Sequence, residues 1–233
     1  MSALAITALN QSYGGSHTLW DVDLVVPVGS RTCLMGRNGM GKTTLLKCIM
    51  GLLPVTSGVI EFAGTDLLKL PVQGRARLGI GYVPQGREIF SQLTVEENLR
   101  IGVGVRPGGP RSIPLQVFEL FPVLKRMLHR RGGDLSGGQQ QQLAIGRALV
   151  LEPTLLILDE PTEGIQPNIV HEIGDILLTL NREAGVTVLL VEQQLRFAQR
   201  VASQFCILEK GRCVTGGSID ELTDEVVRDH LSV

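Results

Sequence analysis

The sequence lacks any long apolar run, and this absence limits how the chain could meet a membrane. No uninterrupted apolar stretch approaches the roughly 20 residues that a membrane-spanning helix needs. The first residues carry no basic stretch ahead of their apolar ones, so we also expect no signal peptide. Any role at a membrane would therefore depend on a partner protein.

The chain also has little charge and few cysteines. Charged residues make up 19% of the 233 residues and the formal net charge is −1, so no basic field would recruit nucleic acid. The four cysteines lie in or beside apolar segments without C-x-x-C spacing. We interpret them as buried, reduced thiols of a cytosolic protein rather than as disulfides or zinc ligands.

A complete phosphate-binding loop of the pattern G-x-x-x-x-G-K-[ST] spans residues 36–43. Glycines let the backbone aim successive N–H groups at a phosphate, Lys42 adds a cation for the β- and γ-phosphates, and the Thr43 hydroxyl can ligate Mg²⁺. The alternative is a glycine-rich turn without a ligand. A buried strand is predicted just before the loop, at 31–35, and a helix just after it, at 44–50, which favours nucleoside triphosphate binding. The predicted binding residues of this loop are Gly36, Asn38, Gly39, Gly41, Lys42, Thr43 and Thr44.

Two acidic residues, Asp159 and Glu160, follow an apolar strand predicted at 155–158. Ligands of open α/β folds bind at the carboxyl ends of parallel strands, where these side chains would stand. We predict that Asp159 holds the Mg²⁺ shell and that Glu160 polarises an attacking water. Acidic residues at a strand end are often only solvated, but the phosphate-binding loop upstream favours the catalytic interpretation.

The segment Ser136-Gly137-Gly138-Gln139 opens a predicted helix at 137–149 and offers a second anion site at a helix N-terminus. One phosphate chain does not need two cradles, so we predict a composite site in which this segment caps nucleotide held by a neighbouring subunit. Taken alone, the segment could be a mere helix cap. Its place in the order of loop, Gln85, this segment and the acidic pair favours the composite site.

The hydrophobic pattern predicts an α/β fold. In the first part of the chain, residues 3–9 and 19–28 alternate like antiparallel strands with one covered face, and short strands are expected at 58–63 and 80–83.

Later in the chain, helices alternate with strands. Besides the strand at 155–158 and the helix at 137–149, a helix is expected at 169–184 and an apolar strand at 187–191. Continuous apolar strands between helices indicate a parallel sheet covered on both faces.

Residues 86–134 differ from the rest and read as a small helical insertion. Thr94 and Glu97 have the spacing of a capping box at a helix start. Residues 106–111 indicate a loop, and residues 115–129 have helical periodicity.

Together these motifs resemble the ATP-binding cassette (ABC) family over essentially the whole chain. The resemblance implies an α/β P-loop NTPase cassette with a RecA-like, mostly parallel sheet, an N-terminal antiparallel β-subdomain and an inserted α-helical subdomain. We therefore expect a single ATP-binding domain over 1–233, with its core at 1–85 and 135–233 and the insertion at 86–134.

The resemblance also implies roles for single residues. Tyr13 would stack on adenine, and Gln85 would reach Mg²⁺ and the attacking water. Mg²⁺ would be held by Thr43, Gln85 and Asp159. Two cassettes would close around two ATP molecules, each lying between one phosphate-binding loop and the opposite cradle formed by Ser136, Gly137, Gly138 and Gln139.

Two positions depart from the family pattern. Gln193 stands where the family usually has a histidine at the γ-phosphate, and Gln166 where it usually has an aspartate. A glutamine amide can donate a hydrogen bond, but it cannot become cationic or relay a proton. With Glu160 and Gln193 as the catalytic pair, we expect this chain to work opposite a non-identical cassette, with two unequal ATP sites.

The transported solute is predicted from resemblance alone. Glu192-Gln193 and residues 163–167 resemble the ATP-binding subunits of hydrophobic and branched-chain amino-acid importers, and residues 35–44 and 82–90 are more similar to the second ATPase subunit of urea importers. Urea import is thus the first expectation. Branched-chain amino-acid import and a low-turnover regulatory cassette are the alternatives, whereas a soluble cassette of DNA repair or translation would need coiled coils, a second cassette or basic surfaces.

The expected partners follow from the same resemblance. They are a second, non-identical ABC ATPase subunit (or a second copy of this chain when it is isolated), two transmembrane permease subunits and, indirectly, a periplasmic solute-binding protein, with no nucleic acid. The expected location is peripheral, on the cytoplasmic face of a bacterial inner membrane. The membrane partner is expected to dock on the insertion, with Ile89, Phe90 and Leu93 as candidate contacts.

Overall fold

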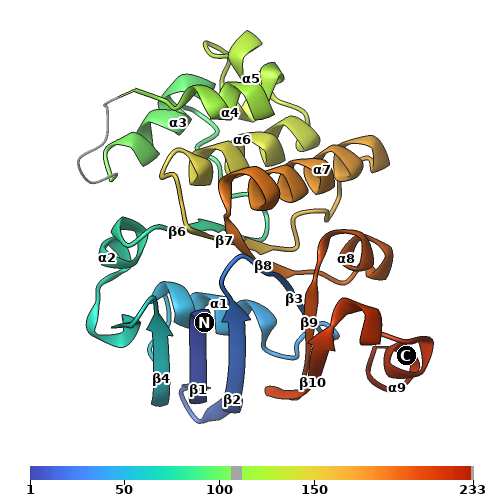
Figure 1. Cartoon of the computed structure of the whole chain (residues 1–233). Helices are drawn as coiled ribbons and strands as arrows, with labels where there is room; N and C mark the ends of the chain where they lie inside the picture. The colour runs from blue at the N-terminus through green and yellow to red at the C-terminus, as the bar shows by residue number, and fades with distance from the viewer. Residues whose placement is uncertain (106–111, 232–233) are drawn as a thin grey trace.

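Two β-sheets organise the chain, and the computed structural model describes residues 1–105 and 112–231 (Figure 1). The first sheet is antiparallel and has the strand order β2-β1-β4-β5. Its strands are β1 (Ser2–Tyr13), β2 (Ser16–Pro27), β4 (Ser57–Phe62) and β5 (Thr65–Asp66). The predicted antiparallel strands are therefore confirmed, and their alternating apolar side chains pack over the first helix, α1 (Lys42–Met50).

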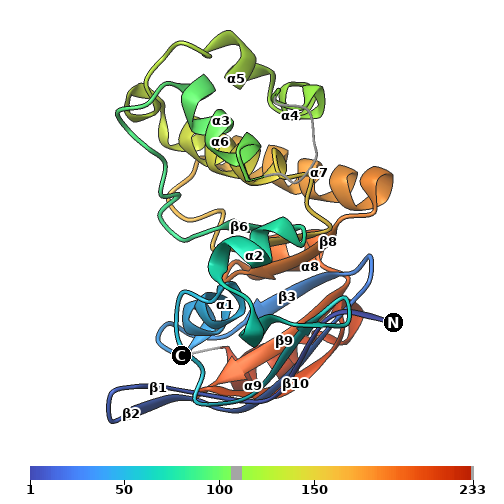
Figure 2. The same ribbon diagram turned by 90° about the vertical axis from the view of Figure 1, so that its left-hand side faces the viewer.

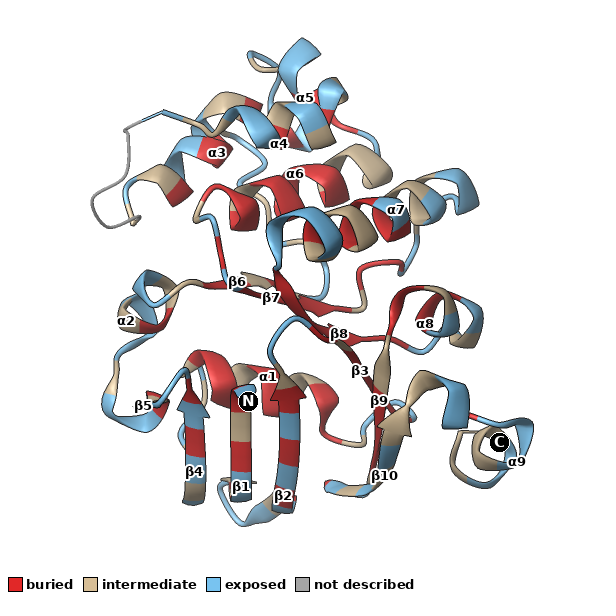
Figure 3. Cartoon of the chain, viewed as in Figure 1, coloured by how far each residue is buried: buried red, intermediate tan, exposed pale blue. Residues whose placement is uncertain are grey.

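The second sheet is mixed, with the strand order β10-β9-β3-β8-β7-β6. Its first five strands along the chain, β3, β6, β7, β8 and β9, run parallel, and β10 is antiparallel to β9. Every residue of β7 and β8 is buried, as expected for strands covered on both faces (Figure 3). The bounds are β3 Arg31–Met35, β6 Ile80–Val83, β7 Leu155–Asp159, β8 Thr187–Val191, β9 Gln204–Glu209 and β10 Arg212–Ser218.

The helices lie on both sides of the mixed sheet, and a group of them stacks beyond β6 and β7 (Figure 2). Helix α3 begins at the predicted capping box of Thr94 and Glu97. The predicted loop at 106–111 lies outside the described residues. The remaining bounds are α2 Val72–Arg77, α3 Val95–Val103, α4 Leu115–Leu120, α5 Pro122–Arg126, α6 Gly137–Leu149, α7 Pro167–Ala184, α8 Leu195–Val201 and α9 Asp224–His230.

The helical periodicity at 115–129 does not correspond to one continuous helix. The structure has two short helices there, α4 and α5, that meet at Phe121 and Pro122. Proline has no N–H to donate and disfavours the helical conformation of the residue before it, and Phe121 accordingly has φ −128° and ψ 73°. Phe121 is fully buried at this break, so the chain bends around a core side chain.

Among the described residues, no helix is both long and apolar enough to cross a bilayer.

Candidate functional site

The phosphate-binding loop joins β3 to α1 and holds its lysine in place. The Lys42 ammonium donates hydrogen bonds to the carbonyl oxygens of Gly36 at 2.7 Å and Arg37 at 2.9 Å. Its side chain is only 4% exposed, and burial lowers the pKa of Lys42 while the nearby carboxylates of Glu160 and Asp159 oppose this shift. The cation is therefore fixed at the loop before any phosphate arrives.

Two glycines of the loop are required by its backbone. Gly36 has φ 147°, and a Cβ atom there would lie 2.3 Å from the carbonyl oxygen of Leu208 on β9. Gly41, with φ 101°, stands in the left-handed region just before α1. The loop can thus approach the sheet edge closely and then turn so that the N-terminus of α1 faces the site.

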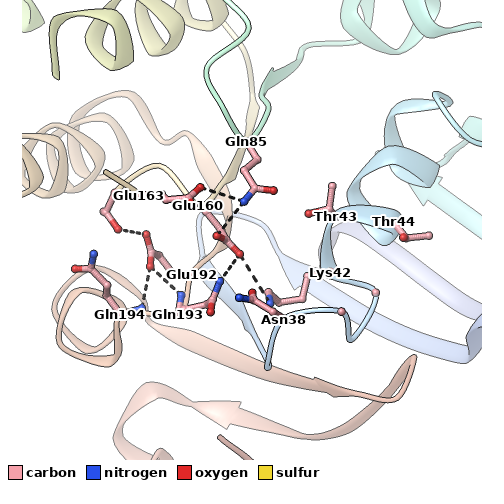
Figure 4. A pocket seen from close by; sticks show the side chains of 13 residues that line it. Asn38, Lys42, Thr43, Thr44, Gln85, Glu160, Glu163, Glu192, Gln193 and Gln194 are labelled. Atoms are coloured by element: carbon pink, nitrogen blue, oxygen red, sulfur yellow. Dashed lines mark hydrogen bonds and ion pairs between the residues drawn. The ribbon is translucent and has the colours of Figure 1, made fainter. Parts of the chain in front are cut away.

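A cavity of about 540 Å³ lies in front of this loop (Figure 4). It brings together the carboxyl ends of three neighbouring strands and the start of α1, as ligand sites of α/β sheets do. The lining residues are Asn38, Gly39, Gly41, Lys42, Thr43 and Thr44, then Gln85 after β6, Glu160, Thr162 and Glu163 after β7, and Glu192, Gln193 and Gln194 after β8.

Glu160 is the centre of the hydrogen bonds in the cavity. The Gln193 amide donates to Oε1 of Glu160 at 2.6 Å, and the Gln85 amide donates to Oε2 at 3.3 Å (Figure 4). The Lys42 ammonium lies 3.9 Å from the same carboxylate. Two side chains predicted to contact the γ-phosphate, those of Lys42 and Gln193, and one predicted to reach Mg²⁺ and the attacking water, that of Gln85, therefore converge on one carboxylate.

Glu192 is a site residue that the sequence analysis named only for its resemblance. It is 2% exposed, and its Oε2 accepts hydrogen bonds from the backbone N–H groups of Gln193 at 2.8 Å and Gln194 at 2.9 Å. The Thr162 hydroxyl donates to its other oxygen, and burial raises the pKa of Glu192. Glu192 thus fixes the turn that aims Gln193 at Glu160. A carboxylate at the end of a fully apolar strand was the signal that could have found it.

Asp159 lies beneath the cavity, at the end of β7. It is 1% exposed, and within the described residues neither of its carboxylate oxygens has a hydrogen-bond partner. Burial raises the pKa of Asp159 to about 6, the Glu160 carboxylate adds to this shift, and Thr43 and Lys42 oppose it. Buried polar groups normally have partners, so these two oxygens fit a role in holding a hydrated cation next to Thr43.

Tyr13 lies at the edge of this region. Tyr13 is 48% exposed, and its hydroxyl is 3.3 Å from the Thr44 hydroxyl of α1. This position is compatible with the predicted stacking on a base, which stays a prediction.

Ser136, Gly137, Gly138 and Gln139 stand apart from the phosphate-binding loop. They line a second cavity of about 540 Å³, with Gln166, and in the described part of the chain this cavity shares no lining residue with the first. Ser136 and Gln139 form a capping box at the start of α6, with Ser136 N–H donating to Gln139 Oε1 at 3.0 Å. The helix-cap interpretation therefore holds within the chain, and the composite site stays a prediction.

Fold and site together define a nucleotide-binding P-loop ATPase. Residues 19–163 match the family model described as ABC transporter, and the chain belongs to this family. As the resemblance implied, it is an ATP-binding ATPase.

Curated relatives cover nearly the whole chain. The chain is 43% identical to the high-affinity branched-chain amino acid transport ATP-binding protein BraG of Pseudomonas aeruginosa, over 97% of both proteins. It is 38% identical to the probable branched-chain amino acid transport ATP-binding protein LivF of Archaeoglobus fulgidus, over 95% of this chain and 94% of the relative.

Solved structures share the fold. A dimeric ATP-binding cassette in a post-hydrolysis state with ADP and Pi superposes with a TM-score of 0.84 at 26% identity, covering 93% of this chain and 98% of that one. An ATP-binding subunit of an ABC transporter superposes with a TM-score of 0.83 at 30% identity, covering 98% and 93%. The predicted fold class is confirmed.

The hydrogen bond from Gln193 to Glu160 gives a first testable prediction. Replacing Gln193 by alanine should lower kcat for ATP hydrolysis roughly 10- to 100-fold, because a hydrogen bond to a charged group contributes about 1.5–3 kcal/mol. Gln193→His, which can still donate, should retain more activity. Steady-state ATPase assays would measure both, with Gln194→Ala as control because it keeps the backbone N–H that Glu192 binds. An unchanged kcat in Gln193→Ala would show that this hydrogen bond does not position Glu160.

Proposed function

We propose that the chain is the ATP-hydrolysing subunit of an importer for branched-chain amino acids. The observation that carries this proposal is the 43% identity to a branched-chain amino acid transport ATP-binding protein over 97% of both chains. A second relative at 38% identity has the same kind of name. These relatives give no support to the first expectation, urea import, and favour the alternative instead.

The chemistry proposed for the cavity uses the side chains that line it. Lys42 and the N–H groups of residues 38–44 bind the phosphates, and Tyr13 stacks on the base. Glu160 accepts the proton of the attacking water, while Gln193 and Gln85 hold this carboxylate and the water in line. Mg²⁺, when bound, neutralises charge on the phosphates, and Thr43, Asp159 and Gln85 are the residues that would hold it.

We also propose that two cassettes complete each other's sites. Because the cradle of Ser136, Gly137, Gly138 and Gln139 lines a different cavity from the phosphate-binding loop, it caps the nucleotide of a partner cassette. Gln193 and Gln166 favour a non-identical partner and unequal sites. Residues 1–233 would form one ATP-binding domain, in which 86–134 are the helical insertion.

The membrane side of the assembly is part of the same proposal. The chain would sit peripherally on the cytoplasmic face, with two permease subunits and, indirectly, a solute-binding protein. Phe90, next to the Gln85 segment, is 47% exposed, which suits a contact with a permease, whereas Ile89 packs against the core.

Uptake measurements in the source organism test the transported solute. Disrupting the gene should abolish the leucine uptake that depends on this transporter and leave urea uptake unchanged. The wild-type gene should restore leucine uptake, and Lys42→Ala should not, because the loop then lacks its cation. Loss of urea uptake with leucine uptake intact would overturn the amino-acid assignment.

A further inference from the structure

The segment after Gln85 has an unusual backbone. Gly86, Arg87 and Glu88 have φ values of 76°, 73° and 45°, so three consecutive residues occupy the left-handed region, and two of them are not glycine. For the two non-glycine residues, Arg87 and Glu88, this backbone costs of order 1–3 kcal/mol each and persists only where the surroundings hold it. The described structure must therefore contain contacts that keep this segment in place.

The Arg87 side chain makes those contacts in two directions. Its Nη1 donates to Oε1 of Gln140 on α6 at 3.3 Å, and its Nη2 donates to the backbone oxygen of Glu163 at 3.5 Å. A Cβ on Gly137 would lie 3.2 Å from Nη1, so the guanidinium rests against the first residue of α6. Arg87 thus bridges the segment after β7 and the start of the helix that carries the cradle.

Helix α6 also holds the same segment from its other end. Arg147 lies in the last turn of α6, and its Nη2 donates to the backbone oxygen of Arg87 at 3.5 Å. The same guanidinium lies 5.2 Å from the centre of the Phe90 ring. Residues 87–90 are therefore attached to α6 at two points.

Gln85 connects the segment that contains Arg87 to the nucleotide cavity, which it lines. The Gln85 amide nitrogen donates to Glu163 Oε2 at 3.0 Å and to Glu160 Oε2 at 3.3 Å. Glu163 consequently contacts Gln85 through its carboxylate and Arg87 through its backbone oxygen. Any displacement of Gln85 by a γ-phosphate would act on the position of Arg87.

We propose that Arg87 is a positioning residue that couples the nucleotide cavity to the cradle of the same chain. When a γ-phosphate moves Gln85, the Arg87 bridge transfers this change to Gly137 and Gln140 at the start of α6. The inference rests on the proposed function, because the cradle contacts a nucleotide only if it caps the ATP site of a partner cassette.

Hydrogen exchange with the non-hydrolysable ATP analogue AMP-PNP and Mg²⁺ tests this coupling within one chain. At a protein concentration where light scattering shows monomers, the analogue should slow amide exchange at 37–43 and also at 137–142. We expect the effect at 137–142 to be roughly fivefold or more in the wild type, the lower end of usual coupling factors. In Arg87→Ala the effect at 137–142 should vanish while that at 37–43 remains, and Arg87→Lys should restore part of it.

Glu88→Ala is the matched control, since Glu88 shares the left-handed backbone and has an exposed side chain. It should behave like the wild type. Equal slowing at 137–142 in the wild type and in Arg87→Ala would overturn the inference, as would no slowing there in the wild type. If residues 37–43 show no effect either, nucleotide binding at the loop fails, and the proposed function fails with it.

Discussion

Replacing Glu160 by glutamine should lower kcat for ATP hydrolysis by roughly 10²- to 10⁴-fold, the usual contribution of a positioned general base. The amide has nearly the shape of the carboxylate but cannot accept a proton from the attacking water. Lys42 keeps its hydrogen bonds to Gly36 and Arg37, so nucleotide affinity should change little.

Steady-state turnover and equilibrium binding of a fluorescent ATP analogue would separate these two effects. The control is Glu61→Gln, which changes an exposed carboxylate on β4, away from the cavity. Turnover of Glu160→Gln within a few-fold of the wild type would remove Glu160 from its proposed role, and a parallel loss of binding would make its role structural.

Replacing Asp159 by asparagine should stabilise the nucleotide-free protein at pH 7.5 by up to about 3 kcal/mol, the free energy that corresponds to its raised pKa, while abolishing Mg²⁺-dependent hydrolysis. Its pKa is raised from 3.8 to about 6 in the fold, so the folded state prefers the protonated form. The protonated Asp159 carboxyl makes its whole contribution to the free energy of unfolding below pH 4, and this contribution is lost as pH rises through about 6. Asparagine carries no charge, so the Asp159→Asn variant does not lose this stability as pH rises.

Urea unfolding of wild type and Asp159→Asn at several pH values measures this effect. The stability difference should be largest above pH 7 and should shrink toward pH 4. Glu192 also has a raised pKa, but it is present in both proteins and cancels in the difference. If Asp159→Asn is no more stable than the wild type at pH 7.5, the Asp159 carboxylate is not the unpaired buried charge that the structure indicates.

Short-range signals predicted much of the fold. The bounds of β3, β6 and β8 agree with the sequence analysis because each is a short, mostly apolar segment, and those of α6 agree because Ser136 caps its start. The strand β10 carries Gly216 and Gly217 and alternates in exposure, so it is not such a segment. The neighbouring β9 has the apolar pattern but was not predicted either.

The same distinction applies to the site. The phosphate-binding loop is contiguous, so its spacing alone predicts its chemistry. The contact of Gln193 with Glu160 depends on β8 lying next to β7, and that of Gln85 with Glu163 on β6 lying on the other side of β7. Strand order is a property of the whole fold, and no local pattern encodes it.

The separation of the two cavities has a consequence for genetics. In a pair of cassettes joined as proposed, a lesion in the loop of one chain and a lesion in the cradle of the same chain damage different ATP sites. A loop lesion in this chain and a cradle lesion in its non-identical partner would fall together in one site and leave the other intact. A strain with both of these lesions should then be no more defective than either single mutant, whereas a loop lesion and a cradle lesion in this chain alone damage both sites.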